Sequence, residues 1–284
     1  HTKDGQVHFA PAAFLGSAFP AFRTAMTDSG VRAVRSGTTW INSCPVPGAP
    51  RVVAALQQAG FTVSMDETTR VAISGAVQSA QEDVQGAQEI LANIERSLAA
   101  RGRTLYRYQR EGVLTLLGHR AHILGDDMGL GKTLQMLCTV PAGGSALVVC
   151  PALVKGGFAQ EVRTWRPDLT PVILSGRGSF RLPAPGEVVI TNYEILPGER
   201  EQGQDRIDLS TIPTPPQGLI MLVDEIHRCG ASKTLVTGRI AALASKVLDN
   251  GGRVYGATGT LMRTKPENVW NILRALRLTG RAFG

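Results

Sequence analysis

The stretch that decides the fold of this chain is residues 125–133, Gly-Asp-Asp-Met-Gly-Leu-Gly-Lys-Thr. It follows a short apolar segment, residues 121–124, and leads into Leu-Gln-Met-Leu at 134–137, which has the character of a helix. A strand, a glycine-rich turn and a Gly-Lys-Thr that opens a helix form the pattern of a phosphate-binding loop, whose backbone N–H groups point at phosphates. In such a loop Lys132 reaches the β- and γ-phosphates, and the Thr133 hydroxyl holds Mg²⁺. The pattern therefore predicts ATP or a related ligand.

A second motif lies about ninety residues further on, at residues 219–227, Leu-Ile-Met-Leu-Val-Asp-Glu-Ile-His. Five apolar residues that end in two carboxylates predict a buried parallel strand with acid at its C-terminal end, the edge where such sheets bind ligands. Asp224 is expected to contact Mg²⁺ and Glu225 to orient and polarise the attacking water. The predicted catalytic residues are Lys132, Asp224 and Glu225.

Each motif alone has a simpler interpretation. Asp126 stands where the usual phosphate loop has its first glycine, and a glycine-rich turn can bind nothing. A pair of carboxylates after an apolar strand can be a solvated strand end. Because both motifs occur together at the expected separation, we favour an ATP site with Mg²⁺.

Composition leaves several classes of protein open and disfavours others. The 284 residues are 43% hydrophobic, enough for one large domain or for a medium domain with a small one. No apolar run approaches the roughly 18 to 20 residues of a membrane span, and no secretory leader is apparent, so we expect no membrane partner. The net charge of +7 suits a polyanionic partner. Four cysteines without metal-like pairing fit an intracellular, reducing compartment, the cytoplasm or nucleus.

The first part of the chain, residues 1–75, predicts a small α+β accessory domain. It contains a helix at 18–27, a pair of strands at 31–41, a helix that follows the prolines at 45–50, and a strand at 61–65. Residues 76–103 are expected to be a connector whose helix covers 80–100. Its apolar residues recur at spacings of three and four: Val84, Ala87, Leu91, Ile94 and Leu98. Packing on the next domain is the favoured interpretation, and a coiled coil is the alternative.

From residue 104 strands and helices alternate, which predicts a doubly wound α/β domain with a parallel sheet over 104–284. The expected strands are 121–124, 146–150, 172–174, 188–191, 219–223 and 253–257. The expected helices are 107–117, 132–139, 155–165, 234–248 and 266–277. Residues 198–217 are rich in proline and predict a loop insertion.

Further segments resemble the motifs of superfamily-two helicases. Residues 105–112, Leu-Tyr-Arg-Tyr-Gln-Arg-Glu-Gly, are similar to the glutamine motif, in which Gln109 would hydrogen-bond the adenine edge. Residues 147–151 resemble motif Ia, 190–194 resemble motif Ib, and 257–260, Ala-Thr-Gly-Thr, resemble motif III. Asp-Asp-Met-Gly-Leu-Gly-Lys-Thr, Asp-Glu-x-His and Thr-Gly-Thr together resemble the Swi/Snf-type branch, in which an Asp at position 126 is usual.

This resemblance covers residues 104–280 and implies the first RecA-like lobe of a motor that uses ATP to translocate along double-stranded DNA. It implies roles for three sets of residues. The nucleotide set is Tyr106, Gln109, Arg110, Met128, Gly129, Gly131, Lys132, Thr133 and Leu134, with Thr133 and Asp224 on Mg²⁺. The set that couples nucleotide to DNA is His227, Thr258 and Gly259. Ile226, Leu261 and the segment 229–233 depart from the family pattern, so the coupling is expected to differ in detail.

The partners follow from the same resemblance. Loops after strands would hold the DNA backbone through hydroxyl, amide and cationic groups, and such binding would weaken steeply with salt. The expected contacts are Lys155, Thr191, Asn192, Thr260, Arg263 and Lys265, each of which can instead be a solvated surface residue. A second RecA-like lobe would supply an arginine finger worth roughly 10³ to 10⁵ in rate. Since the chain stops soon after motif III, we expect weak turnover from it alone.

The first domain carries a weaker resemblance to the HARP-type domain of annealing helicases. It rests on a short helix at 31–34, on Trp40, and on Ala-Gly-Phe-Thr-Val at 59–63 after a helix. A small packing domain with a buried Trp is the alternative.

Three functions remain in view. The first is the ATP-binding lobe of a double-stranded DNA translocase. The second is a strand-separating DNA or RNA helicase of the same superfamily, which stimulation by duplex DNA would distinguish. The third is a scaffold that keeps the ATP pocket but hydrolyses nothing.

Overall fold

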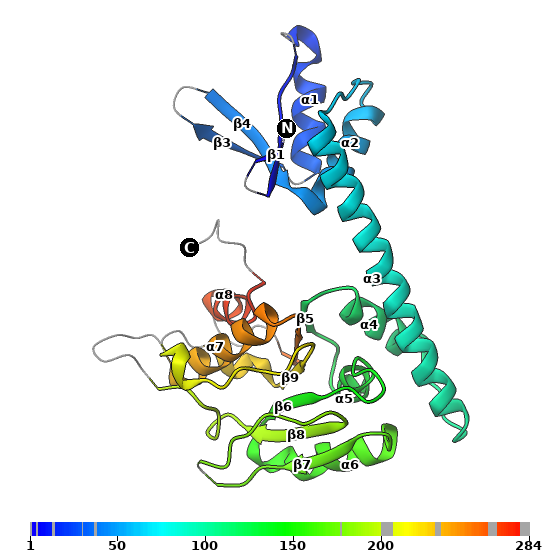
Figure 1. The fold of residues 1–284 in the computed structure, drawn as a ribbon, viewed down its shortest axis with the longest axis vertical. Coiled ribbons are helices and arrows are strands. Elements are labelled where there is room, and N and C mark those ends of the chain that lie inside the picture. The colour runs from blue at the N-terminus through cyan, green and yellow to red at the C-terminus, as the bar shows by residue number, and fades with distance from the viewer. Residues whose placement is uncertain are drawn as a thin grey trace. The chain divides into compact units, whose positions relative to one another are not determined.

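The computed structural model describes residues 2–3, 5–12, 15–29, 31–36, 39–176, 178–199, 207–230, 234–260 and 266–278. The chain forms two compact units, residues 1–85 and residues 86–284 (Figure 1). No helix among the described residues is long and apolar enough to cross a membrane.

The first unit pairs a four-stranded antiparallel sheet with two helices. The sheet has the order β1-β2-β4-β3, with β1 at Thr2–Lys3, β2 at Gln6–Phe9, β3 at Arg32–Ser36 and β4 at Thr39–Pro45. Helix α1 covers Phe19–Asp28 and α2 covers Ala49–Gln58. One core joins them, made of Val7, Phe22, Ala25, Met26, Cys44, Ala49, Val52 and Leu56. The predicted helices and the strand pair of this unit are confirmed.

Two local predictions for this unit are wrong. Residues 61–65 are described throughout and belong to no strand. Phe61 instead packs edge-on against Phe22, with ring centroids 5.8 Å apart, and Val63 also packs against the core. The alternation of apolar residues at 61–65 thus reflects packing against this core and not pairing in a sheet. The short helix that the HARP-type resemblance implies at 31–34 is also absent, because residues 32–36 form β3 and pair with β4. The side chain of Trp40 lies outside the described part.

Helix α3 covers Glu67–Ala99 and begins well before residue 80. Its start is set by Asp66, whose carboxylate accepts a hydrogen bond from the Thr69 backbone N–H at 2.7 Å. That bond lowers the pKa of Asp66. An N-cap of this kind satisfies an N–H that has no partner within the helix.

The C-terminal part of α3 belongs to the second unit, where it packs against the two helices that follow it. Ala87, Leu91, Ile94 and Leu98 share a core cluster with Leu105 and with residues of α4, Arg107–Leu117, and α5, Lys132–Leu137. Val84 lies outside this cluster and is 55% exposed. The apolar stripe at 87–98 is therefore covered within the lobe, which favours the packed helix over the coiled coil.

The second unit is built on a six-stranded parallel sheet of order β5-β10-β9-β6-β8-β7. Its strands are β5 Ala121–Leu124, β6 Ala146–Cys150, β7 Thr170–Ile173, β8 Glu187–Asn192, β9 Ile220–Asp224 and β10 Arg253–Ala257. All six predicted strands are present, with ends shifted by at most two residues. The α/β prediction with a RecA-like parallel sheet is confirmed.

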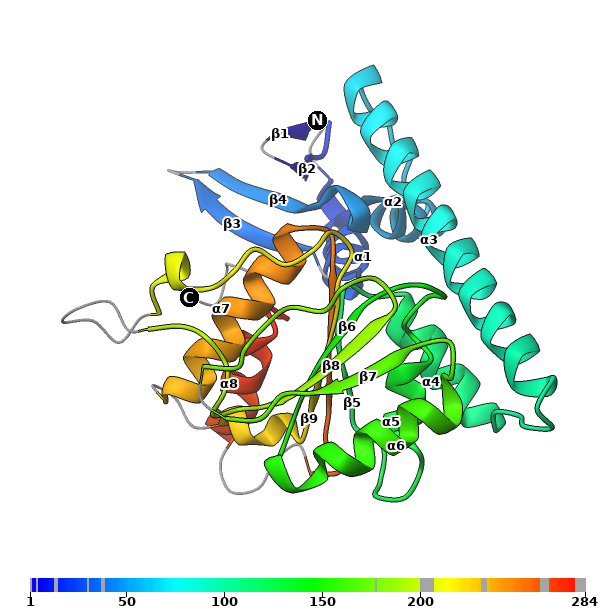
Figure 2. The same ribbon diagram turned by 60° about the horizontal axis from the view of Figure 1, so that its bottom comes forward.

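Helices cover both faces of this sheet. Figure 2 shows α4, α5 and α6 (Lys155–Trp165) on one side and α7 (Leu235–Asp249) and α8 (Pro266–Ala275) on the other. Strand β6 is buried on both faces, since Ala146, Val148 and Cys150 join the α4–α5–α6 side while Leu147 and Val149 join the α7–α8 side.

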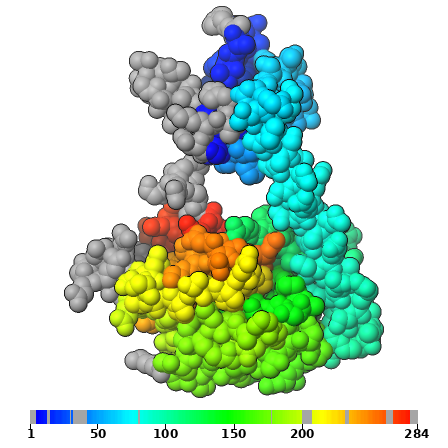
Figure 3. Space-filling model, in the orientation of Figure 1, coloured from blue at the N-terminus to red at the C-terminus, as the bar shows by residue number. Residues whose placement is uncertain are grey.

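The predicted insertion, residues 198–217, returns along α7. Its described residues include a short 3₁₀ turn at Leu209–Thr211. Lys246 of α7 donates to the carbonyl of Ile212, and the Asn250 amide donates to the carbonyl of Pro215 at 2.7 Å. The yellow segment and the orange helix accordingly adjoin on the surface of this unit (Figure 3).

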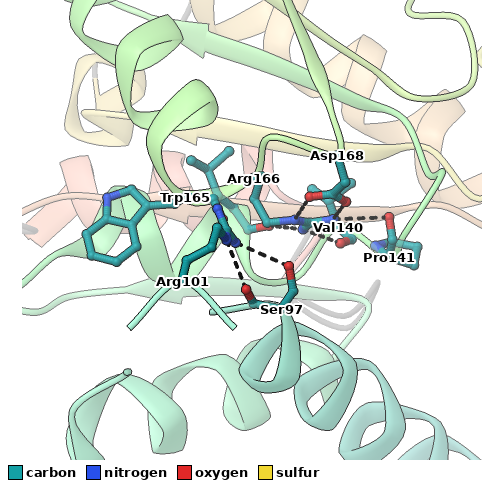
Figure 4. Close-up of polar contacts among 8 residues, drawn as sticks. Ser97, Arg101, Val140, Pro141, Trp165, Arg166 and Asp168 are labelled. Atoms are coloured by element: carbon teal, nitrogen blue, oxygen red, sulfur yellow. Dashed lines mark hydrogen bonds and ion pairs between the residues drawn. The ribbon is translucent and has the colours of Figure 1, made fainter. Parts of the chain in front are cut away.

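The C-terminal end of α5 is capped by a buried arginine that the sequence does not single out. Arg166, only 3% exposed, donates to the carbonyls of Leu137, Val140 and Pro141 and forms two bonds with the Asp168 carboxylate (Figure 4). The last carbonyls of a helix lack partners within it, so a cation that bonds them stabilises the helix end. Arg166 thereby holds the helix that follows the phosphate loop.

Candidate nucleotide-binding site

Three motifs converge at one edge of the parallel sheet. Strand β10 lies between β5 and β9, and the last residues of the three strands are in register: Leu124 opposite Ala257, and Ala257 opposite Asp224. The phosphate loop leaves β5 at this edge, residues 258–260 leave β10, and Glu225 leaves β9. Parallel sheets of this kind bind ligands at the carboxyl ends of their strands.

The phosphate loop takes a conformation that needs glycine at two positions. Gly129 and Gly131 have φ of +86° and +76°, in the left-handed region. A Cβ at Gly131 would also lie 2.6 Å from Nε2 of Gln109. Lys132 donates to the backbone carbonyls of Asp126 and Asp127 at 2.8 and 2.9 Å. Its ammonium thus lies over the loop, held by neutral oxygens that phosphate oxygens can replace.

The residues after β10 lie beside that loop. A Cβ at Gly259 would lie 3.0 Å from Cγ of Met128 and 3.8 Å from Nζ of Lys132. A side chain at position 259 would require the Met128 side chain to shift. Gly259 therefore lies against the phosphate loop, so a change in the loop's conformation would reach it. Met128 is 85% exposed to solvent.

The two carboxylates differ in environment. Asp224, the last residue of β9, is half-buried, and burial raises its pKa; the charge of Glu225 raises it further, while the charge of Lys132 acts to lower it. The charge of Lys132 therefore acts on Asp224 across this edge of the sheet. Glu225 has φ of +53°, an uncommon conformation for a residue with a side chain.

A hydrogen-bonded group connects Glu225 to the end of β10. Nδ1 of His227 lies 3.0 Å from Oε2 of Glu225 and 3.0 Å from the hydroxyl of Thr258. The Thr258 hydroxyl in turn accepts from the backbone N–H of Thr260 at 3.1 Å. His227, Thr258 and Gly259, which the resemblance implies as coupling residues, are thus brought together next to the predicted catalytic carboxylate.

Tyr193 is a site residue that sequence reasoning missed. It follows β8, is 1% exposed, and its hydroxyl donates to the backbone carbonyls of both Asp224 and Glu225. Burial raises the pKa of this hydroxyl above its usual range, so the group stays protonated as a donor. The guanidinium of Arg228 covers its ring at 5.5 Å. A buried Tyr hydroxyl usually donates to an acceptor. The position of Tyr193 directly after an apolar strand was therefore the sequence signal for a role in this site.

The glutamine motif is placed beside the loop, but its contacts differ from those expected. Gln109 is 5% exposed; Oε1 accepts from the Tyr106 backbone N–H at 3.0 Å, and Nε2 donates to the Leu130 carbonyl at 3.3 Å. It therefore links the start of α4 to the phosphate loop, and an adenine would have to share this amide. Tyr106 is 69% exposed and stacks on Tyr108, with ring centroids 5.8 Å apart, so its face is accessible to a base.

Two other members of the predicted nucleotide set point elsewhere. Arg110 forms an ion pair with Glu95 of α3 at 2.5 Å, so its guanidinium is directed at α3. Leu134 is 5% exposed and belongs to the core cluster under α3, so only its backbone can face a phosphate. Thr133 is half-buried at the second position of α5.

Most of the predicted DNA contacts are occupied within the chain or lie outside the described residues. Lys155 donates to the Leu174 carbonyl at 2.7 Å and to Oδ1 of Asn192 at 2.9 Å, and the Asn192 amide donates to Glu194. Thr191 is fully buried. Thr191 and Asn192 are therefore not surface groups, and the half-buried Lys155 is engaged by the end of β8 and the loop after β7. Thr260 is exposed. Arg263 and Lys265 lie outside the described residues.

Comparison with known protein families decides the identity of this lobe. The family model of the SNF2-related domain matches residues 88–279, more than half of the chain. The chain belongs to the SNF2-related family. The ATPase fold expected from the sequence is thus that of an SNF2-related ATPase domain, and ATP is its nucleotide.

Relatives of this SNF2-related chain are much longer proteins. It is 28% identical over 184 residues to the bovine (Bos taurus) "SWI/SNF-related matrix-associated actin-dependent regulator of chromatin subfamily A-like protein 1", covering 62% of this chain and 18% of that protein. It is 27% identical over 227 residues to "Probable ATP-dependent DNA helicase CHR12" of Arabidopsis thaliana, covering 72% of this chain and 18% of that protein. The chain therefore spans under a fifth of the length of these relatives.

Among solved structures, the chain is similar to the "Sulfolobus solfataricus SWI2/SNF2 ATPase core in complex with dsDNA". The two are 22% identical, with a TM-score of 0.45, over 61% of this chain and 36% of that one.

Proposed function

We propose that this chain is the ATP-binding lobe of a motor that translocates along double-stranded DNA and remodels DNA or protein–DNA structures. The observation that carries the proposal is the register at the sheet edge. It places the phosphate loop, the Asp224-Glu225 pair and residues 258–260 on three neighbouring strands. A site with these three parts can bind a nucleoside triphosphate and pass its state to a neighbouring loop.

The residues present suit ATP with Mg²⁺. Lys132 bonds only backbone carbonyls among the described residues, so its positive charge is available to phosphates. The Thr133 hydroxyl and the Asp224 carboxylate are the hard oxygen ligands that Mg²⁺ prefers, and Mg²⁺ would neutralise charge that develops on the phosphates. Glu225 orients the attacking water and accepts the proton that the water loses. Nδ1 of His227 positions the Glu225 carboxylate through Oε2.

Hydrolysis would change the oxygens available to Lys132 at the loop, and Gly259 lies against that loop. A shift there reaches Thr258 and His227 through the bonds described above. We propose that this path couples the nucleotide to the grip on DNA, with Thr260, Arg263 and Lys265 as backbone contacts. The net charge of +7 supports a polyanionic partner.

DNA is favoured over RNA by the names of two relatives, "Probable ATP-dependent DNA helicase CHR12" and "DNA excision repair protein ERCC-6-like". A second RecA-like lobe, in the full protein or in trans, is part of the proposal, because catalysis of this type uses an arginine from across the cleft. The four cysteines are free and buried, which supports an intracellular, reducing location.

The test is ATP turnover with no nucleic acid, duplex DNA, single-stranded DNA and RNA in turn, with and without a supplied second lobe. Duplex DNA is expected to stimulate turnover most. Lys132→Ala should abolish it by removing nucleotide binding, and Glu225→Gln should abolish turnover while ATP still binds. Arg107→Ala, at a 92% exposed side chain in α4, is the control and should change neither.

Other outcomes distinguish the competing functions. Stimulation by RNA or single strands, but not by duplex, would identify a strand-separating helicase. ATP binding without turnover even with the second lobe present would indicate a nucleotide-dependent scaffold.

A further inference from the structure

One polar side chain behind the phosphate loop is fully buried and has no part in the mechanism above. Gln135 lies in the first turn of α5, directly after the loop, and is 0% exposed. Its Nε2 donates to Oδ2 of Asp126 at 2.8 Å and lies 3.4 Å from the carbonyl oxygen of Leu130. A single amide thus contacts two residues of the loop.

Asp126 stands at the position where phosphate loops usually have their first glycine, and it presents two oxygens in different directions. Its backbone carbonyl accepts from Lys132, whereas its half-buried carboxylate accepts from Gln135. A carboxylate in this loop would repel phosphates if it were directed toward them. The bond from Gln135 turns the charge toward the protein interior instead.

The surroundings of Gln135 leave it little freedom. A Cβ added to Gly112 of α4 would lie 1.9 Å from Oε1 of Gln135. That Oε1 is buried and accepts no hydrogen bond from the described residues. A buried acceptor without a donor lowers the stability of the fold. A residue with such an acceptor calls for an explanation, and here the Nε2 end of the same amide provides one. The amide is thus held in one orientation, with its donors toward the loop.

We propose that Gln135 is a positioning residue for nucleotide binding, which acts by holding the Asp126 carboxylate away from the phosphates. This inference rests on the proposed function, since it needs the loop to bind a polyphosphate. The Asp that replaces the glycine provides an anchor for the loop, and Gln135 removes the electrostatic penalty that the anchor would otherwise bring. A loop held in advance also loses less conformational freedom on binding.

The test compares ATP, ADP and AMP binding by wild type, Gln135→Leu, Asp126→Asn and the double variant. Gln135→Leu should weaken ATP binding on the order of tenfold, as expected for a lost bond to a charged group. The loss should be smaller for ADP and smallest for AMP, because repulsion grows with phosphate charge. Asp126→Asn should bind ATP nearly as wild type, since its side-chain oxygen still accepts from Gln135.

The double variant separates positioning from packing. If the carboxylate charge is the cause, Asp126→Asn should restore most of the ATP affinity lost in Gln135→Leu. Gln160→Leu, at an exposed glutamine of α6, controls for the substitution itself and should change nothing. Thermal unfolding of each variant checks the fold, and Gln135→Met, which keeps the side-chain length, replaces Gln135→Leu if that variant does not fold.

Two outcomes would overturn the inference while the proposed function stands: unchanged ATP affinity in Gln135→Leu, or an equal loss for all three nucleotides without rescue in the double variant. Failure of wild type to bind any nucleotide would instead reject the proposed function.

Discussion

At the scale of single residues, the site depends on a strained position held by a buried hydroxyl. Glu225 has φ of +53°, which costs free energy for a residue with a side chain. The Tyr193 hydroxyl donates to the carbonyls on both sides of that turn, of Asp224 and Glu225. Tyr193 thereby helps to hold the backbone that carries both predicted catalytic carboxylates.

Tyr193→Phe is expected to lower the free energy of unfolding by about 1 kcal/mol, the usual value of one hydrogen bond, and to reduce kcat more than ATP affinity. The reason is that the variant keeps the ring but removes the donor to the Asp224 carbonyl, whereas the Glu225 carbonyl still accepts from the Arg228 backbone N–H at 3.0 Å. Denaturant unfolding and turnover assays measure both quantities. Tyr108→Phe, at a 40% exposed ring, is the control, and equal effects of the two changes would contradict the account.

The same scale shows where sequence alone was sufficient and where it was not. Lys132, Asp224 and His227 lie at or after the ends of strands β5 and β9, a position that apolar runs in the sequence reveal, and their roles stay predictions. The partners of Gln109, Lys155 and Asn192 depend on which loops meet, and no local pattern reports that. Arg110 illustrates the difference, since it forms an ion pair with Glu95 of the preceding helix α3, which no local pattern around Arg110 indicates.

At the scale of elements, helix α5 is held at both ends. Gln135 ties its first turn to the phosphate loop, and Arg166 with Asp168 caps its end (Figure 4). Burial alone would raise the pKa of Asp168, but the hydrogen bonds and the charge of Arg166 outweigh it, and the pKa is lowered below 3.8. The ionised form is thus the one that the fold stabilises.

Asp168→Asn should therefore lower the thermal midpoint at neutral pH. A carboxylate whose folded pKa is lowered contributes its full stability above the unfolded value of 3.8, and that contribution is lost as pH falls through the folded pKa. The difference between variant and wild type should accordingly shrink below pH 3.8. Thermal unfolding across pH measures it. Asp249→Asn, which removes a surface pair with Arg277, should have little effect at any pH, and a pH-independent difference for Asp168→Asn would contradict the assignment.

Helix α3 offers a second test at this scale. Leu91 is 3% exposed in the cluster beneath α3, whereas Val84 on the same helix is 55% exposed. Leu91→Ala should cost about 2 to 5 kcal/mol of unfolding free energy through the cavity it leaves, and Val84→Ala should cost little. Chemical denaturation compares them. Equal costs would mean that the stripe faces a partner helix, as in a coiled coil.

The start of α3 and the missing strand at 61–65 show why element boundaries were harder to predict than the elements themselves. Asp66 caps α3, but Val71, Ile73 and Val77 in the turns after it are spaced by two and by four residues, so helical periodicity is weak there. Phe61 and Val63 show an alternation typical of a strand, yet they pack, partly buried, against the core that α1, α2 and the sheet of the first unit form. Tertiary contacts outweighed the local pattern in both places.

At the scale of the whole molecule, the chain consists of two units with separate cores. Every part of the candidate nucleotide site lies in residues 86–284. A chain limited to residues 86–284 should therefore fold and bind ATP within about threefold of the full chain, a difference under 1 kcal/mol. Circular dichroism and nucleotide titration measure this. Loss of the fold, or a much larger loss of affinity, would show that the first unit is part of the site.

The central claim is that residues 125–133 and 224–225 form an ATP site, and calorimetric titration tests it most directly. A non-hydrolysable ATP analogue with Mg²⁺ would be titrated into the wild type and into Lys132→Ala. We predict one site per chain for the wild type and a loss of affinity of at least about a hundredfold for the variant, roughly 3 kcal/mol for a lost charged contact. No binding by the wild type, or equal binding by both, would contradict the account.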